Sequence, residues 1–403
     1  MPEAGNEPFS TGRVLPYTRQ CLSRQDIEAV VNVLSSPWLT QGPEVARLER
    51  AVATYCGAEY AVAVSSGTAA LHLACLALDL GPGDRLWTSP LTFVASANCG
   101  RYCGATVEFV DIDARHYNLS IAALAAGLER AEQQGTLPKV VVAVHFAGQS
   151  VDMMPLQELG CRYGFSVIED ATHALGGRYR GEAVGSCRFS DLAVFSFHPA
   201  KAIAGGEGGM IVTNRADLYE RLMRLRSHGI VRDRSSMAKT DAPDWYYEQR
   251  DLGFNYRLSD LHAALACSQL GRLDEFVVRR RERVQRYQEA LADLPLIRPW
   301  QSGLDESAWH LYVIQVDEAR TRCRRDRLYQ ALVGAGIMAN VHYIPVHLHP
   351  YYRAQGWGPG DFPEAESYYR RALTLPLFPA MTDADQNRVI AVLRETLNTT
   401  PAA

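Results

Sequence analysis

The stretch Leu192-Ala193-Val194-Phe195-Ser196-Phe197-His198-Pro199-Ala200-Lys201 joins an apolar run to a lone lysine, and the glycine-rich run Gly205-Gly206-Glu207-Gly208-Gly209 follows it. Upstream, a second apolar run, Val167-Ile168-Glu169-Asp170, ends in a carboxylate. Short apolar runs bounded by turn residues are typical of buried strands. The two runs therefore predict neighbouring strands of one sheet, each with a polar side chain at or just beyond its end.

The surrounding sequence extends this pattern. We expect strands over residues 60–64, 85–87, 107–111, 140–144, 166–169, 192–195 and 210–213, with helices over 69–80, 121–133 and 155–163 between them. Alternating strands and helices with nearly continuous apolar strands predict an α/β fold with a mostly parallel sheet that is covered on both faces. Ligands bind such sheets at the carboxyl ends of the strands, which is where Asp170, Ser196 and Lys201 fall.

The rest of the chain predicts a second, smaller unit. Residues 231–250 are polar and weakly periodic, so we expect a surface loop there, and a long helix over 259–291. A strand over 310–316 and helices over 324–335, 364–372 and 383–397 follow. Because 403 residues exceed one ordinary core, we predict a large domain over 1–258 and a smaller C-terminal domain over 259–403 that includes the linking helix.

Composition excludes several classes of function. A formal net charge of -4 and the lack of a long basic run argue against a nucleic-acid partner. No stretch approaches the 18 uninterrupted apolar residues of a membrane span, and the polar, acidic N-terminus predicts no secretory signal. The nine cysteines show no ligand spacing, so we expect reduced thiols, no metal site and a cytoplasmic location.

Lys201 and Asp170 together have the chemistry that pyridoxal phosphate (PLP) requires. A strand-end lysine carries the cofactor's aldehyde as a Schiff base, and a buried carboxylate keeps the pyridine nitrogen protonated. Lysine alone is ambiguous, because most lysines are solvated. Its usual pKa of about 10.4 would have to be lowered by burial and by the cofactor before the amine could act as a base.

A phosphate site is the third element of this prediction. The segment Ser65-Ser66-Gly67-Thr68 closes a strand and opens a helix, so free backbone amides lie at the positive end of the helix dipole. The signal is weak alone and gains weight beside Lys201 and Asp170, and Ser196 could add a hydroxyl. For Asp170 and His173 the alternative is a capping aspartate followed by a surface histidine.

Larger motifs carry a resemblance to a known family. They are Gly67-Thr68, Thr92-Phe93, Asp170-Ala171 with Ala174, Ser196-Phe197 with Lys201, Gly206-Glu207-Gly208-Gly209, Arg226-Ser227-His228-Gly229 and Gly253-Phe254-Asn255-Tyr256-Arg257. With these motifs the chain resembles the DegT-type nucleotide-sugar aminotransferases, and the resemblance runs from residue 16 to about residue 395. It implies the aspartate-aminotransferase fold type I: a large domain with a mostly parallel central sheet and a smaller α+β C-terminal domain.

The resemblance also implies a role for each matching residue. Lys201 would be the Schiff-base lysine, Asp170 the partner of the pyridine nitrogen, and His173 would face the ring hydroxyl. Phe93 would stack on the cofactor ring, and the phosphate would be held by Gly67, Thr68 and Ser196. Asn255 would reach the phosphate in the neighbouring subunit, so the active site would belong to a homodimer. His342 and His347 would face the sugar.

The implied reaction is transfer of the amino group of L-glutamate to the 4-keto group of a nucleotide-linked deoxysugar. The segments 144–149, 197–201 and 342–347 are most similar to those of family members that aminate a UDP-linked 4-keto sugar on the way to pseudaminic acid. Ala200, Ala202 and Ala204 depart from that pattern and leave the sugar open. A lysine at 201 argues against the branch that carries histidine there and removes a sugar hydroxyl instead.

Two alternatives remain open from the sequence. One is an aminotransferase that acts on a 3-keto sugar or a cyclitol ketone. The other is a regulatory protein that keeps the PLP fold and binds the cofactor without turnover.

Overall fold

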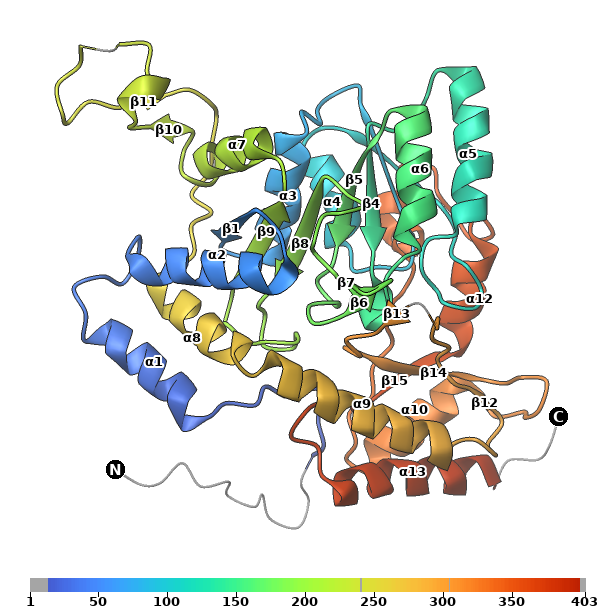
Figure 1. Cartoon of the computed structure of the whole chain (residues 1–403). Coiled ribbons are helices and arrows are strands. Elements are labelled where there is room, and N and C mark those ends of the chain that lie inside the picture. The colour runs from blue at the N-terminus through green and yellow to red at the C-terminus, as the bar shows by residue number, and fades with distance from the viewer. Residues whose placement is uncertain (1–13, 240, 304, 399–403) are drawn as a thin grey trace.

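A seven-stranded sheet lies at the centre of the computed structural model, which describes residues 14–239, 241–303 and 305–398 (Figure 1). In spatial order its strands are β1 (Tyr60–Val64), β9 (Gly209–Thr213), β8 (Leu192–Ser196), β5 (Ser166–Asp170), β4 (Val140–Val144), β2 (Arg85–Thr88) and β3 (Thr106–Phe109). Strands β8, β5, β4, β2 and β3 pair in parallel, whereas β9 runs antiparallel to both β8 and β1. The prediction of an α/β fold with a mostly parallel sheet is confirmed.

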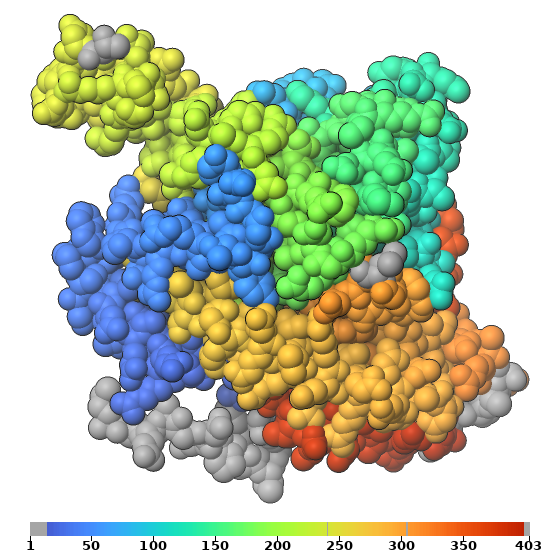
Figure 2. Space-filling model, in the orientation of Figure 1, coloured from blue at the N-terminus to red at the C-terminus, as the bar shows by residue number. Residues whose placement is uncertain are grey.

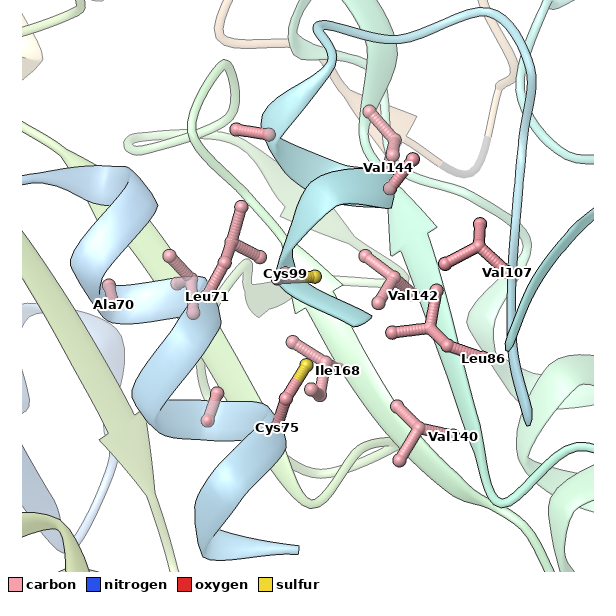
Figure 3. Packing of buried hydrophobic residues seen from close by; sticks show 14 of the residues in the cluster. Ala70, Leu71, Cys75, Leu86, Cys99, Val107, Val140, Val142, Val144 and Ile168 are labelled. Carbon is pink, nitrogen blue, oxygen red and sulfur yellow. The ribbon is translucent and has the colours of Figure 1, made fainter. Parts of the chain in front are cut away.

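Helices cover both faces of this sheet. One face packs against α3 (Gly67–Ala77), α4 (Ala95–Tyr102) and α7 (Ala216–Arg226), and the other against α2 (Pro43–Cys56), α5 (Ile121–Gln134), α6 (Met153–Tyr163) and α8 (Asp260–Leu270). Figure 3 shows the first face, where Leu71 and Cys75 of α3 and Cys99 of α4 lie over Val142 and Ile168 of the sheet. Strands buried on both faces explain the continuous apolar runs in the sequence.

A second core lies in the C-terminal part of the chain. The antiparallel sheet β12 (Leu296–Ile297), β14 (Tyr312–Val316) and β15 (Ala372–Leu375) packs with α9 (Leu273–Ala290), α10 (Arg325–Gly334) and α13 (Asp383–Asn398). The remaining helical elements are α1 (Arg24–Leu34), α11 (Pro350–Arg353), α12 (Pro363–Arg371) and the short turns η1 (Phe146–Gly148), η2 (Arg234–Ser236) and η3 (Val346–Leu348). A small sheet joins β13 (Asp305–Glu306) to β6 (Arg178–Tyr179) and β7 (Glu182–Ala183).

Two local predictions differ from the structure. The long helix expected over 259–291 is two helices, because Gly271 ends α8 and Arg272, with φ -116° and ψ 8°, is not helical. Glycine destabilises a helix interior, which is consistent with a break there. The loop expected over 231–250 contains a short hairpin of β10 (Ile230–Val231) and β11 (Glu248–Gln249), and this hairpin projects from the body (Figures 1 and 2).

The division into domains at residues 258 and 259 stays a prediction. Helix α8, on the C-terminal side of that boundary, packs against α1 and α2 from the start of the chain. In the described ranges no helix is both long enough and apolar enough to cross a membrane.

Candidate active site

A cavity of about 510 Å³ opens at the carboxyl ends of β5 and β8. Its walls come from distant parts of the sequence: the start of α3, the start of α4, the strand ends, and the segment that follows α10. The residues that line it include Gly67, Thr68, Phe93, Ser96, Asp170, Ser196, Lys201, His310, Asn340, His342 and Tyr343. Six of these residues are predicted from sequence to hold the cofactor, and His342 is predicted to face the sugar.

Lys201 lies in the turn between β8 and β9, where its backbone N–H donates to the carbonyl oxygen of His198 at 2.8 Å. Burial lowers the pKa of its amine from 10.5 to about 8, although the nearby charge of Asp170 acts in the opposite direction. Loss of hydration disfavours the charged form of a lysine. The amine therefore has a substantial neutral fraction near neutral pH, as a nucleophile or base requires.

Asp170 is the last residue of β5 and is 4% exposed. Its Oδ2 accepts a hydrogen bond from Ser96 Oγ at 2.6 Å, and its Oδ1 accepts one from the backbone N–H of Thr172 at 3.2 Å. A buried carboxylate is costly unless it is hydrogen-bonded or paired with a charge. Here two donors from different elements hold it at the cavity wall.

The first turn of α3 forms a narrow cradle beside β8. Ser66 caps the helix by accepting from the backbone N–H of Ala69 at 3.1 Å. A Cβ atom at Gly67 would lie 2.9 Å from Cβ of Ser196 and 3.3 Å from its Oγ, so the helix start and the strand end approach as closely as glycine allows. Backbone amides at the positive end of a helix bind phosphate readily.

These residues fit PLP. A primary amine, a buried carboxylate for the ring nitrogen and a helix start for the phosphate surround one cavity. Phe93 lines the same cavity with 57% of its surface exposed, and its ring centroid lies 6.2 Å from that of Tyr343.

His173 is buried, unlike a surface histidine. The backbone N–H of Ala147 donates to its Nδ1 at 3.3 Å, and its Nε2 lies 3.2 Å from the hydroxyl of Tyr343. Burial is the largest of the causes that hold the pKa of His173 well below its ordinary value, so the ring is neutral. His173 is absent from the described cavity lining, but it contacts Tyr343, which does line the cavity.

The structure separates the two histidines predicted to face the sugar. His342 lines the cavity; its Nδ1 lies 2.8 Å from Thr374 Oγ1, and burial lowers its pKa to about 4. His347 is fully buried outside the described lining, with its Nε2 3.1 Å from a carboxylate oxygen of Glu366. Asn255 is exposed and also lies outside this lining.

Sequence reasoning missed four of the cavity residues named above: Ser96, His310, Asn340 and Tyr343. His310 is 5% exposed, and its Nδ1 is buried without a hydrogen-bond partner among the described residues. Its ring centroid lies 4.4 Å from that of His173. The only available signal was position, since His310 begins a predicted strand and Ser96 and Tyr343 adjoin motifs that were recognised.

Comparison with known proteins agrees with this geometry. Residues 20–394 match the model of the DegT/DnrJ/EryC1/StrS aminotransferase family. The spore coat polysaccharide biosynthesis protein SpsC of Bacillus subtilis is 41% identical over 384 residues, which cover 94% of this chain and 96% of SpsC.

Solved structures give the same result. PseC of Helicobacter pylori, an aminotransferase involved in the biosynthesis of pseudoaminic acid, superposes with a TM-score of 0.86 at 29% identity, covering 96% of this chain and 100% of PseC. Spr1654 of Streptococcus pneumoniae in its PMP (pyridoxamine phosphate) form has a TM-score of 0.86 at 27% identity, covering 95% of this chain and 99% of that one.

Proposed function

The chain belongs to the DegT/DnrJ/EryC1/StrS family of PLP-dependent sugar aminotransferases, and we propose that it transfers the amino group of L-glutamate to the 4-keto group of a nucleotide-linked deoxysugar. The observation that carries the proposal is the amine of Lys201 beside Asp170 in one cavity, with its pKa lowered to about 8. When bound, PLP supplies an aldehyde that takes up the amino group and a ring that accepts electrons.

Lys201 has two tasks in this proposal. It would hold the aldehyde carbon of the cofactor, and after displacement its free amine would move the proton between the substrate Cα and the C4′ carbon of the cofactor. An amine with a pKa of about 8 suits this task, since efficient proton transfer needs a pKa near the working pH.

Other side chains would hold the cofactor. Asp170 would keep the pyridine nitrogen protonated, and Phe93 would cover the ring. The phosphate would be bound at the start of α3 by Gly67, Thr68 and Ser196, where the close approach of helix and strand supports the assignment. His173 would face the ring hydroxyl, either directly or through the Tyr343 hydroxyl that it contacts.

The site would be completed in a homodimer. Asn255 is exposed and lies outside the described lining of the cavity in its own chain, which is compatible with a contact to the phosphate in a neighbouring subunit. We propose a cytoplasmic enzyme, because its proposed amino acceptor, a nucleotide-linked sugar, would be a water-soluble substrate.

The proposed acceptor is a UDP-linked 4-keto-6-deoxy sugar, as the resemblance of segments 144–149, 197–201 and 342–347 implies. The likeness to PseC supports a role in pseudaminic acid synthesis, and the likeness to SpsC supports a role in polysaccharide synthesis. His342 lies in the cavity and would face the sugar.

The test begins with the absorption spectrum of the PLP-loaded protein. Adding L-glutamate should convert the yellow PLP form to the PMP form, with 2-oxoglutarate released in equal amount. A Lys201→Arg variant, which keeps the positive charge but lacks the primary amine, is the matched control and should show no conversion.

The second step supplies keto sugars to the PMP form. A UDP-linked 4-keto-6-deoxy sugar should restore the PLP spectrum, and a 3-keto sugar or a cyclitol ketone should not. Restoration only by the latter compounds would replace the proposed acceptor. A PLP form that neither glutamate nor other amino acids convert would support the non-catalytic alternative.

A further inference from the structure

Two buried hydroxyl groups form a hydrogen-bonded chain to the carboxylate of Asp170. Ser96, in the first turn of α4, is 1% exposed and places its Oγ 2.6 Å from Asp170 Oδ2. Thr92, just before α4, is 2% exposed and places its Oγ1 2.7 Å from Ser96 Oγ. These contacts link the start of α4 to the end of β5.

The direction of these hydrogen bonds follows from the charge of the carboxylate. An ionised carboxylate only accepts hydrogen bonds, so Ser96 must donate its single hydroxyl proton to Asp170. The other acceptor within reach, the carbonyl oxygen of Phe93, is neutral and more distant at 3.3 Å. Because the proton of Ser96 is then committed, Thr92 must donate to Ser96.

We propose that Ser96, supported by Thr92, is a positioning residue that fixes the orientation of the Asp170 carboxylate for the cofactor ring. The proposal rests on the proposed function only for the identity of the ring. Ser96 binds Oδ2 while the backbone of Thr172 binds Oδ1, so both oxygens are restrained by donors on different elements. Hydrogen bonds to the charged form of a carboxylate favour that form.

A short bond to a charged acceptor is among the stronger hydrogen bonds in proteins. Without Ser96, the carboxylate would keep one backbone donor and could rotate about its last torsion. The ring nitrogen would then meet a carboxylate that is less well aligned. The expected consequence is weaker cofactor binding and a slower proton transfer, with little change in how glutamate itself binds.

The first experiment measures PLP binding, independently of turnover. Apo-protein is titrated with PLP, and the dissociation constant is compared among the native protein, Ser96→Ala, Ser96→Thr and Thr92→Val. We expect Ser96→Ala to weaken binding about tenfold, as loss of one charge-assisted hydrogen bond implies. Thr92→Val should weaken it about threefold, and Ser96→Thr, which keeps the hydroxyl, should stay within about twofold of the native value.

A matched control separates this effect from the loss of any buried hydroxyl. Ser150 is 5% exposed and donates to the carbonyl oxygen of Val151 at 2.8 Å, away from the described lining of the cavity. Ser150→Ala should leave the PLP dissociation constant unchanged. If Ser150→Ala and Ser96→Ala weaken binding equally, the effect is general destabilisation and the proposal is wrong.

A double variant tests whether Ser96 acts through Asp170. In an Asp170→Ala background, Ser96→Ala should change PLP affinity by less than about twofold, because the group it orients is already absent. A full tenfold loss in that background would contradict the proposal. If Ser96→Ala does not fold, the effect of Thr92→Val on PLP affinity is compared between the native and Asp170→Ala backgrounds instead.

The pH dependence of the absorption spectrum of bound PLP distinguishes a positioning role of Ser96 from a purely structural one. Loss of stability alone would leave this pH dependence unchanged. The pH at which the absorption band of bound PLP changes should shift in Ser96→Ala and return in Ser96→Thr. If the protein transaminates, kcat for glutamate should fall about tenfold with KM nearly unchanged. If the protein does not transaminate, the proposed function fails. The PLP affinity and the PLP spectrum still test the role of Ser96 in that case, because neither measurement needs turnover.

Discussion

The two walls of the cavity differ in how their polar groups are satisfied. On one wall, here called the sheet wall (Gly67, Ser96, Asp170, Ser196 and Lys201), the carboxylate has donors on both oxygens. The facing wall, here called the histidine wall (His310, Asn340, His342 and Tyr343), includes a buried ring nitrogen of His310 without a partner among the described residues. Unsatisfied buried polar atoms are uncommon and costly.

From this difference we infer that the walls serve different ligands. A wall whose groups are already fixed suits a cofactor of constant shape. The unpartnered Nδ1 of His310 is itself buried. We therefore propose that the cavity-lining part of the histidine wall, which includes His342, meets the hydroxyl and carbonyl groups of a nucleotide-linked sugar. Burial lowers the pKa of both His310 and His342, so both rings are neutral near pH 7.

The largest effect should come from the sheet wall. Lys201→Ala removes the only group proposed to bond to the cofactor and to move the Cα proton. We expect the rate of PMP formation from glutamate to fall roughly 10³-fold or more, in the range typical of a lost general base. Rapid mixing with absorption detection measures this rate. A loss of less than about tenfold would show that another residue carries the proton.

The histidine wall should give a smaller and different effect. His310→Phe fills the same space without a ring nitrogen, and we expect the KM for the keto sugar to rise about tenfold. PMP formation from glutamate should stay nearly unchanged, because Lys201, Asp170 and the phosphate cradle lie on the sheet wall and only Tyr343 of the histidine wall is proposed to reach the cofactor. His310→Gln keeps a hydrogen-bonding amide and should recover part of the loss. Equal losses in both half-reactions would remove the distinction between the walls.

A related contrast compares the two predicted sugar histidines. Since His347 contacts Glu366 outside the described cavity lining, His347→Gln should affect the keto-sugar KM less than His342→Gln does. If His347→Gln raises KM as much as His342→Gln, the sugar extends beyond this cavity.

The walls also differ in how much the sequence predicts. The sheet wall follows from local patterns, because strand ends and helix starts place Gly67, Asp170 and Lys201 at one edge of a parallel sheet. The histidine wall depends on how the C-terminal core docks, and periodicity does not determine that docking. His342 and His347 adjoin the same motif, yet one lines the cavity and the other faces Glu366.

Some errors in the fold have the same origin. The strands of the large sheet were predicted to within two residues, since burial on both faces leaves a clear signal. The helix expected over 259–291 was wrong because the helical pattern continues across Gly271, where the backbone turns. Ser96 was missed because its role depends on contact with Asp170, 74 residues away in sequence.

The close packing of Gly67 against Ser196 on the sheet wall gives a further prediction. Gly67→Ala would place a methyl group 2.9 Å from Cβ of Ser196, and overpacking of this kind typically costs about 1–3 kcal/mol. Part of that strain should widen the cradle, so PLP affinity should fall about fivefold to tenfold. Equilibrium titration of the apo-protein measures the change.

A second substitution tests the cause of that change. Ser196→Gly in the Gly67→Ala background removes the opposing Cβ and should relieve the strain, whereas Ser196→Ala keeps that atom and should not. The comparison is between these two double variants, because both lose the serine hydroxyl. If they bind PLP equally, the methyl group acts on the helix start and not through its contact with Ser196.

The smallest effects concern the thermal stability of the apo-protein. Burial of Lys201 on the sheet wall and of His310 on the histidine wall should lower this stability in different pH ranges. The pKa of Lys201 is about 8 in the folded chain and 10.5 ordinarily, so the unfolded chain binds more protons between these values. Stability therefore falls as pH drops from 10.5 to 8, and the penalty is fully present below pH 8. Lys201→Met should raise Tm by about 2 °C at pH 7 and lose this advantage above pH 10.5.

For His310 the folded pKa lies well below its ordinary value of 6.5, mainly because of burial, so its penalty appears only as pH falls below 6.5. The advantage of His310→Phe should accordingly grow from pH 7 to pH 5, while that of Lys201→Met stays constant over the same interval. Thermal unfolding of both variants and the native apo-protein at pH 5, 7, 9 and about 10.5 separates the two windows. If the Tm differences of the two variants follow the same pH profile, the effects come from a shared change in packing. They would then not come from the separate burial of an amine and an imidazole.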